Sequence, residues 1–284
     1  NRDEAAIEKA LAYLVRTQAR DGSWRSSVQG GTYPGTMTAL AGLALMAGGS
    51  TPAQGKYALN VRRGVEFVMQ CASPSGLLAR LEEEMRPMYS HGFCMLFLAQ
   101  AYGMETDPVR QNQIHKILAA AVKLTAQSQS PAGGWLYTPD ANADEGSVTV
   151  TQIQGLRACR NAGIKVPKST IDRACEYIAK CANADGGISY SLASRGSSRP
   201  PITAAAVATL YNAGAYDNPI ALKALEYIKG QMKSTTVQMT FGGHGFYGML
   251  YSAQAMYLSG EENWRDYFPK VREELLKSQS QAGS

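Results

Sequence analysis

The chain of 284 residues is 45% hydrophobic and 18% charged, with a net charge of +5 at pH 7. This composition is typical of a globular protein with a large buried core. The basic residues are dispersed, which argues against a nucleic-acid partner, and the longest apolar stretch, residues 39–47, is too short for a transmembrane segment.

Amphipathic and wholly apolar segments alternate along the chain. The first amphipathic helix is predicted over residues 4–16, with Ile7, Leu11 and Leu14 on one face. The next helix, residues 36–49, is rich in Ala and Gly and apolar on every side, so it must be buried all round. The alternation continues with amphipathic segments at 62–78, 115–135, 169–190 and 220–231, apolar segments at 88–103, 147–163, 200–214 and 243–260, and a last amphipathic helix that reaches residue 284.

This alternation recurs roughly every 50 residues, which indicates a repeat architecture. An inner ring of apolar helices inside an outer ring of half-polar helices explains both kinds of helix. We therefore predict an all-α fold, an α/α toroid or α/α barrel of about six helix-pair repeats, as a single domain over residues 1–284. The pattern contains six outer helices but five inner ones. We therefore expect the last inner helix to be absent from this sequence, or supplied by something else, and its absence should expose an apolar gap.

Two similar turns, "QARDGSW" at 18–24 and "QSPAGGW" at 129–135, each follow an outer helix. The Gln lies where the last helical carbonyls lack partners, and the Gly permits the positive φ of a helix stop. The Trp can cap the seam between neighbouring repeats while its indole N–H finds an acceptor. These features predict a connection between repeats.

These turns resemble the QW motifs of the prenyltransferase and squalene–hopene cyclase repeat family, at 18–24, 129–135, 185–190 and 279–284. Residues 144–172 also resemble a bacterial subfamily known as prenyltransferase/squalene-oxidase repeat proteins. The resemblance covers nearly the whole chain. It implies a terpene cyclase or prenyltransferase that acts on or binds an isoprenoid, or another apolar small molecule, in a central cavity. The alternative is a non-catalytic toroid that binds a lipid or a protein partner.

The N-terminal ends of the inner helices are the place to look for chemistry, because their dipoles direct positive charge to one mouth of the toroid. At the third inner helix, "DANADEGSVT" (140–149) resembles the DxDD motif with which class II terpene cyclases protonate their substrate. Asp144 takes the position of the proton donor, with Glu145 beside it as a second catalytic candidate. The motif is degraded, since Asn142 replaces the first acid and Glu145 the last. In the alternative interpretation, Asp144 and Glu145 cap the helix.

Two inner helices begin with His-Gly-Phe, at His91 and His244. His91 is a catalytic candidate and His244 a substrate-binding one. The resemblance to protein prenyltransferases, which bind zinc through Asp, Cys and His, raises a zinc site at His91, Cys94 and His244 as an alternative to the expectation of no metal and no cofactor. The family segment is matched poorly, because Cys94 falls too far along the chain. Both histidines are explained equally well by hydrogen bonds at the starts of packed helices.

Aromatic and basic residues complete the predicted site. Tyr89, Phe93, Tyr247 and Tyr251 fall in or beside the His-Gly-Phe helices, where they would contact the substrate and stabilise a carbocation through their ring faces. Core packing is the alternative. Arg199, ahead of the fourth inner helix, would suit a diphosphate, although a solvated loop explains it as well.

Cysteine usage and the first residue bear on location. The five cysteines form no CxxC pair and are expected to be buried, reduced thiols. The chain begins at Asn1 without Met, which fits a trimmed chain or a removed export signal and leaves the location open.

Overall fold

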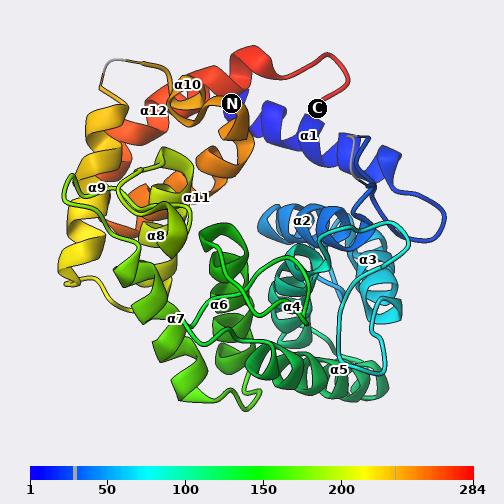
Figure 1. Ribbon diagram of the computed structural model, residues 1–284. Coiled ribbons are helices and arrows are strands. Elements are labelled where there is room, and N and C mark those ends of the chain that lie inside the picture. The colour runs from blue at the N-terminus through cyan, green and yellow to red at the C-terminus, as the bar shows by residue number, and fades with distance from the viewer. Residues whose placement is uncertain (28–30, 234) are drawn as a thin grey trace.

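The computed structural model describes residues 1–27, 31–233 and 235–284 and shows two concentric series of helices (Figure 1). The outer helices are α1 (Arg2–Thr17), α3 (Ala58–Gln70), α5 (Pro108–Gln127), α7 (Lys168–Lys180), α9 (Pro219–Gln231) and α12 (Glu261–Ser278). The inner helices are α2 (Pro34–Ala47), α4 (Pro87–Tyr102), α6 (Gly146–Asn161), α8 (Pro200–Asn212) and α11 (Gly245–Leu258). The short segments η1 (Leu192–Ser194), α10 (Val237–Phe241) and η2 (Gly242–His244) were not predicted from the sequence.

The two kinds of helix differ in burial as their sequences predict. In α4, 12 of 16 residues are buried, whereas in α1, also 16 residues long, Leu11 alone is buried. The inner helices pack closely where they carry glycine. A Cβ on Gly92 of α4 would lie 2.8 Å from the backbone of Thr151 in α6. The predicted α/α toroid is confirmed.

The two Gln–Gly–Trp turns join α1 to α3 and α5 to α7. The indole N–H of Trp24 donates to the Leu14 carbonyl at the end of α1 (2.8 Å), so the predicted acceptor is present. The Gln18 amide donates to Gly22 of its own turn (2.9 Å) and to Asn60 of the next outer helix (3.0 Å). The second turn has the same set of bonds, from Trp135 to Thr125 (2.9 Å) and from Gln129 to Gly133 (2.8 Å) and Thr170 (2.9 Å).

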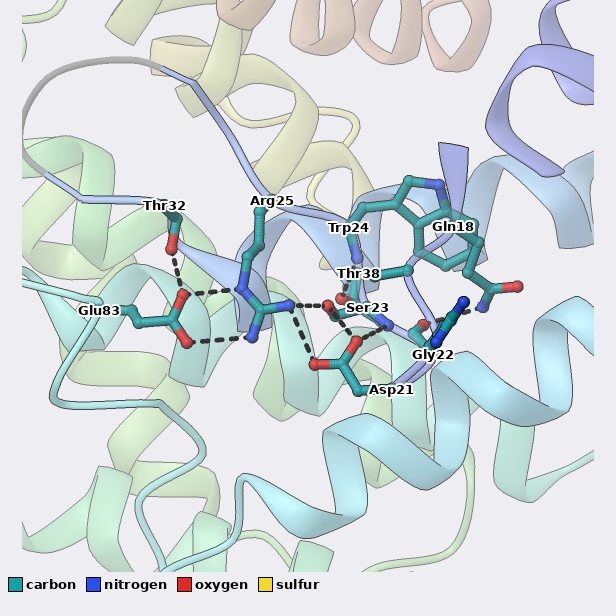
Figure 2. A network of polar contacts seen from close by, with 12 residues as sticks. Gln18, Asp21, Gly22, Ser23, Trp24, Arg25, Thr32, Thr38 and Glu83 are labelled. Atoms are coloured by element: carbon teal, nitrogen blue, oxygen red, sulfur yellow. Dashed lines mark hydrogen bonds and ion pairs between the residues drawn. The ribbon is translucent and has the colours of Figure 1, made fainter. Parts of the chain in front are cut away.

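An ion-pair network fixes the first turn to the loop before α4 (Figure 2). The Arg25 guanidinium donates to both carboxylate oxygens of Glu83, at 2.8 and 3.0 Å, and to Asp21 at 3.0 Å. Thr32 donates a further, short hydrogen bond to Glu83. These donors lower the pKa of Glu83 to about 2.

The outer ring closes, but the inner ring does not. The Gln279 amide donates to the Ala6 carbonyl of α1 (2.9 Å), and Arg272 of α12 pairs with Asp3 (2.7 Å). Successive inner helices pack on one another from α2 through α4, α6 and α8 to α11. The last of them, α11, also packs on α12, but it does not pack against α2 to close the ring. On α11, Phe246 is 82% exposed and Tyr257 is 67% exposed. The predicted apolar gap at the sixth inner position is therefore present among the described residues.

Candidate functional site

A cavity of about 660 Å³ lies at the C-terminal ends of the inner helices. Its volume falls within the range of about 300–1,000 Å³ that is typical of small-molecule sites. Helices α2 and α4 supply a wall of Leu, Ala and Phe side chains, and α11 adds Leu250. Among the apolar lining residues are Leu40, Leu43, Ala44, Phe93, Leu96 and Ala99.

The side of the cavity formed by α6, α8 and α11 carries most of its polar residues, alongside Ala158, Ala162 and Leu250, and we call it the polar wall. The Gln154 and Asn212 amides both donate to Gln254 Oε1, at 3.3 and 3.4 Å. Arg157 donates to the Asn212 carbonyl at 3.3 Å and is the one charged residue of the described lining. The cavity is therefore amphipathic, with aliphatic side chains facing a set of amides and a guanidinium.

A second group of polar residues lies at the N-terminal ends of the same helices. Glu145, 1% exposed, is the N-cap of α6 and accepts the N–H groups of Ser147 (2.8 Å) and Val148 (2.5 Å). The Ser147 hydroxyl lies 2.7 Å from Glu145 and 2.6 Å from the Tyr89 hydroxyl of α4. A hydrogen-bonded chain thus joins Tyr89 to Glu145 through Ser147. Burial raises the pKa of Glu145, and the donated hydrogen bonds oppose that rise.

Tyrosine side chains surround this chain. Tyr137 lies with its ring 6.1 Å from that of Tyr89, and its hydroxyl forms a short hydrogen bond with Tyr190. On α11, Tyr247 and Tyr251 pack edge to face at 4.7 Å, and both hydroxyls are buried without a hydrogen-bond partner among the described residues. We call these five residues the tyrosine cluster.

The cavity and the tyrosine cluster occupy the same helix faces. Tyr89 precedes the lining residue Phe93 by four positions on α4, and Tyr247 precedes Leu250 by three on α11. Residues three and four apart share a face of a helix. The interior faces therefore run from the open cavity at the C-terminal ends to the filled cluster at the N-terminal ends.

Asp144 and Glu145 point to different surroundings. Glu145 has an extended backbone (φ −154°, ψ 163°), and side chains alternate in direction along extended chain. Asp144 accepts a hydrogen bond from Ser130 of the Gln129–Trp135 turn at 2.8 Å. Of the two acids predicted from the sequence, Glu145 is the one hydrogen-bonded to the Ser147–Tyr89 chain.

His91 is fully buried between α4 and α5, away from the tyrosine cluster. Its Nδ1 accepts the Leu78 N–H (3.1 Å), and its Nε2 lies 2.8 Å from the Thr125 hydroxyl. In the neighbouring repeats Thr38 and Thr149 accept the equivalent turn N–H, each at 3.0 Å. Burial lowers the pKa of His91 to about 4, which leaves the ring neutral. His91 thus takes the place of a threonine that anchors the turn.

The residues considered for zinc are not brought together. Cys94 is buried, His244 is exposed in η2, and both ring nitrogens of His91 are engaged. Among the residues that the structure describes, no three His, Cys, Asp or Glu side chains lie close enough to hold a metal ion.

The remaining predicted residue, Arg199, lies at the rim of the cluster. Its guanidinium carbon is 5.3 Å from the centroid of the Tyr190 ring, and that of Arg86 is 4.2 Å from the Tyr137 ring. Phe93, Tyr89, Tyr247 and Tyr251 all lie on the interior faces described above.

A family model of the prenyltransferase alpha-alpha toroid domain matches residues 1–165 and, in a second match, residues 147–248. The chain belongs to this family. No curated protein matches its sequence. Among the described residues, no helix of this toroid protein is long and apolar enough to cross a membrane.

Solved structures share the toroid fold at low sequence identity. The type II terpene cyclase MstE from Scytonema, in its apo form, superposes with a TM-score of 0.66 at 15% identity, over 100% of this chain and 81% of that one. A variant of the same enzyme in complex with its substrate geranylgeranyl dihydroxybenzoate gives a TM-score of 0.64 at 16% identity, over the same shares of the two chains.

The polar wall of the cavity was not predicted from the sequence. Gln154 and Arg157 lie in an inner helix whose residues are otherwise mostly buried. Polar side chains on such a helix are themselves a signal, because burying them without partners costs free energy. Tyr137 and Tyr190 were also missed; each lies three residues after the second glycine of a Gly-Gly turn.

Proposed function

We propose that this toroid protein binds an isoprenoid in the cavity at the C-terminal ends of its inner helices. The observation that carries the proposal is the amphipathic lining, in which Leu40, Leu43 and Leu96 face the amides of α6, α8 and α11. Binding of a branched hydrocarbon chain against the aliphatic wall is favourable because it removes apolar surface from water. A polar head group has hydrogen-bonding partners on the other wall.

The likeness to MstE supports the proposal at the level of the fold. A variant of that enzyme, which shares the toroid architecture, forms a complex with its substrate geranylgeranyl dihydroxybenzoate. At 16% identity the likeness says nothing about individual contacts, so the lining residues of this chain carry the argument.

A cavity-filling variant tests the proposal. Ala44 lies in the lining, so the ring in Ala44→Phe would occupy part of the cavity. Titration of geranylgeraniol into the protein should give saturable binding, and Ala44→Phe should weaken it by about tenfold or more. Ala119→Phe is the matched control, because Ala119 is an exposed position within α5. Absence of binding to the parent protein, or equal binding by both variants, would contradict the proposal.

A second candidate function is proton-initiated cyclisation, which the Tyr89–Ser147–Glu145 chain favours. A protonated Glu145 could restore, through Ser147, the proton that Tyr89 gives to an alkene. The ring faces of the tyrosine cluster would stabilise the resulting carbocation. Loss of a proton from the final cation to water then forms the product alkene, and a proton from water restores Glu145. Incubation with geranylgeranyl substrates and analysis for cyclic products separates this function from binding alone.

A further inference from the structure

We propose that the cavity selects an isoprenoid whose head group is a carboxylate, and that Arg157 binds that head group. This inference rests on the proposed binding function and specifies the class of its ligand. It begins from the position of Arg157, which brings the one charge of the described lining to the edge of an otherwise uncharged cavity.

The guanidinium of Arg157 is incompletely satisfied. Its Nε is buried and has no hydrogen-bond partner, and the group forms no ion pair with any described residue. Its recorded bond is to a neutral acceptor, the Asn212 carbonyl. A buried donor without a partner is costly, and a charged one more so. The guanidinium Nη1 has no hydrogen bond to a described residue either and is not buried, so an anionic group in the cavity can accept a hydrogen bond from it.

Neighbouring amides extend this site. Gln100 and Asn161 are exposed residues at the edge of the cavity, and neither side chain has a hydrogen bond within the described part of the chain, so both are free to contact a ligand. Both can donate to the oxygens of a bound head group, as Arg157 does. A planar carboxylate matches the fork of a guanidinium, and such charge-assisted bonds are among the stronger ones in proteins.

The charge of the site limits the charge of the head group. The cavity lies at the C-terminal ends of the inner helices, where the helix dipoles place partial negative charge. The field of the helix C-termini repels an anion, but this effect falls off within the last turn of each helix. Direct contact with one guanidinium therefore outweighs the repulsion for a head group that carries a single negative charge. A diphosphate carries more charge and would need more cations than the described lining provides. The site therefore favours a carboxylate over a diphosphate.

The aliphatic wall fixes the direction of the ligand. With the carboxylate at Arg157, the hydrocarbon chain extends along α2 and α4 past Leu43 and Phe93. Phe93 lies one turn from Tyr89 on the same helix face. The end of the chain farthest from the carboxylate would then approach the tyrosine cluster.

Three probes with the same hydrocarbon chain test the inference: geranylgeranoic acid, geranylgeraniol and geranylgeranyl diphosphate. We expect the parent protein to bind the acid at least about tenfold more tightly than the alcohol and than the diphosphate. Arg157→Gln should remove the preference for the acid and leave the affinity for the alcohol unchanged within about twofold. Arg157→Lys, which keeps the charge without the fork, should retain part of the preference.

Arg160→Gln is the matched control. It removes the same charge from the same helix at an exposed position outside the lining, and it should leave all three affinities unchanged. Thermal unfolding of each variant shows whether it is folded. Equal binding of acid and alcohol by the parent protein, a preference that survives in Arg157→Gln, or tightest binding of the diphosphate would overturn the inference while the binding function stands. Failure of every probe to bind would overturn both.

Discussion

The hydroxyl of Tyr89, in α4, lies 2.6 Å from the hydroxyl of Ser147, at the start of the neighbouring helix α6. The same Ser147 hydroxyl lies 2.7 Å from the buried carboxylate of Glu145. The Ser147 hydroxyl thus connects the Glu145 side chain, which is buried from solvent, to a tyrosine on the interior face of the toroid. It is the arrangement among the described residues that would let the protein do more than bind.

Tyr89→Phe tests that arrangement. The change removes one hydroxyl, so it should cost about 1 kcal/mol of the free energy of unfolding and leave binding of geranylgeraniol nearly unchanged. Any formation of cyclic products should fall by at least about a hundredfold, the usual effect of removing a proton donor. Tyr102→Phe, on the same helix but outside the cluster, is the control. Undiminished product formation by Tyr89→Phe would rule out the chain as the route of the proton.

The two acids predicted from the sequence can be separated by substitution. If Glu145 restores the proton that Tyr89 gives up, Glu145→Gln should abolish product formation and also destabilise the N-terminus of α6, by about 1–2 kcal/mol. Asp144→Asn should keep activity, because Asp144 bonds to Ser130 in the turn. Product analysis and thermal unfolding on both variants give the answer. A folded but inactive Asp144→Asn would transfer the role to Asp144.

His91 should make stability depend on pH. Its pKa is lowered from 6.5 to about 4 in the folded protein, so the unfolded chain takes up a proton first as the pH falls. The contribution of the neutral ring is complete above pH 6.5 and decreases as the pH falls to about 4. By linkage the loss is about 3 kcal/mol.

Denaturant unfolding of the parent protein and of His91→Gln measures this effect. His91→Gln should be less stable at pH 7, since it loses packing and hydrogen bonds in the core, but its stability should change less between pH 6.5 and pH 4. Parallel pH profiles for the two proteins would exclude His91 as the source.

Glycines in the turns between helices should contribute to stability for two separable reasons. Gly133 has φ +103°, and a Cβ there would lie 2.4 Å from the Arg173 carbonyl of α7. Gly163 has φ +86° but nothing within 4 Å of its Cβ position. Gly163→Ala should therefore cost only the backbone strain, about 1–2 kcal/mol, and Gly133→Ala clearly more. Equal losses in thermal unfolding would show that the contact with α7 contributes nothing.

The fold was predictable because each repeat carries its own pattern. The all-round apolar residues of 36–49 and the striped pattern of 4–16 assign inner and outer helices without any long-range information. The unfilled sixth inner position follows from the same count. The outer ring closes through a hydrogen bond from Gln279 to the Ala6 carbonyl. Gln18 and Gln129 each make the same kind of bond to a carbonyl of the next outer helix.

The location of the cavity was not predictable in the same way. Sequence patterns place residues on a helix face, but whether an end of the ring is filled depends on the sizes of side chains from several helices together. Tyr89, Tyr247 and Tyr251 fill the N-terminal end, whereas Ala44 and Ala99 leave space at the other. The sequence therefore directed attention to the mouth with the acids, and the cavity lies at the opposite one.

The choice between Asp144 and Glu145 was also beyond the sequence. Adjacent residues on extended chain point in opposite directions, and the pattern alone gives no direction for either. His91 illustrates a related difficulty, because a histidine that replaces a threonine in a repeated packing position looks like a candidate catalyst.

A crystal structure of the protein grown with geranylgeraniol would locate the bound alcohol. We expect electron density for the hydrocarbon chain within the cavity, against Leu40, Leu43 and Phe93, with the hydroxyl at the polar wall beside Gln154, Asn212 and Gln254. An empty cavity in a crystal whose protein binds the alcohol in solution, or density for the alcohol elsewhere on the molecule, would contradict the proposed function.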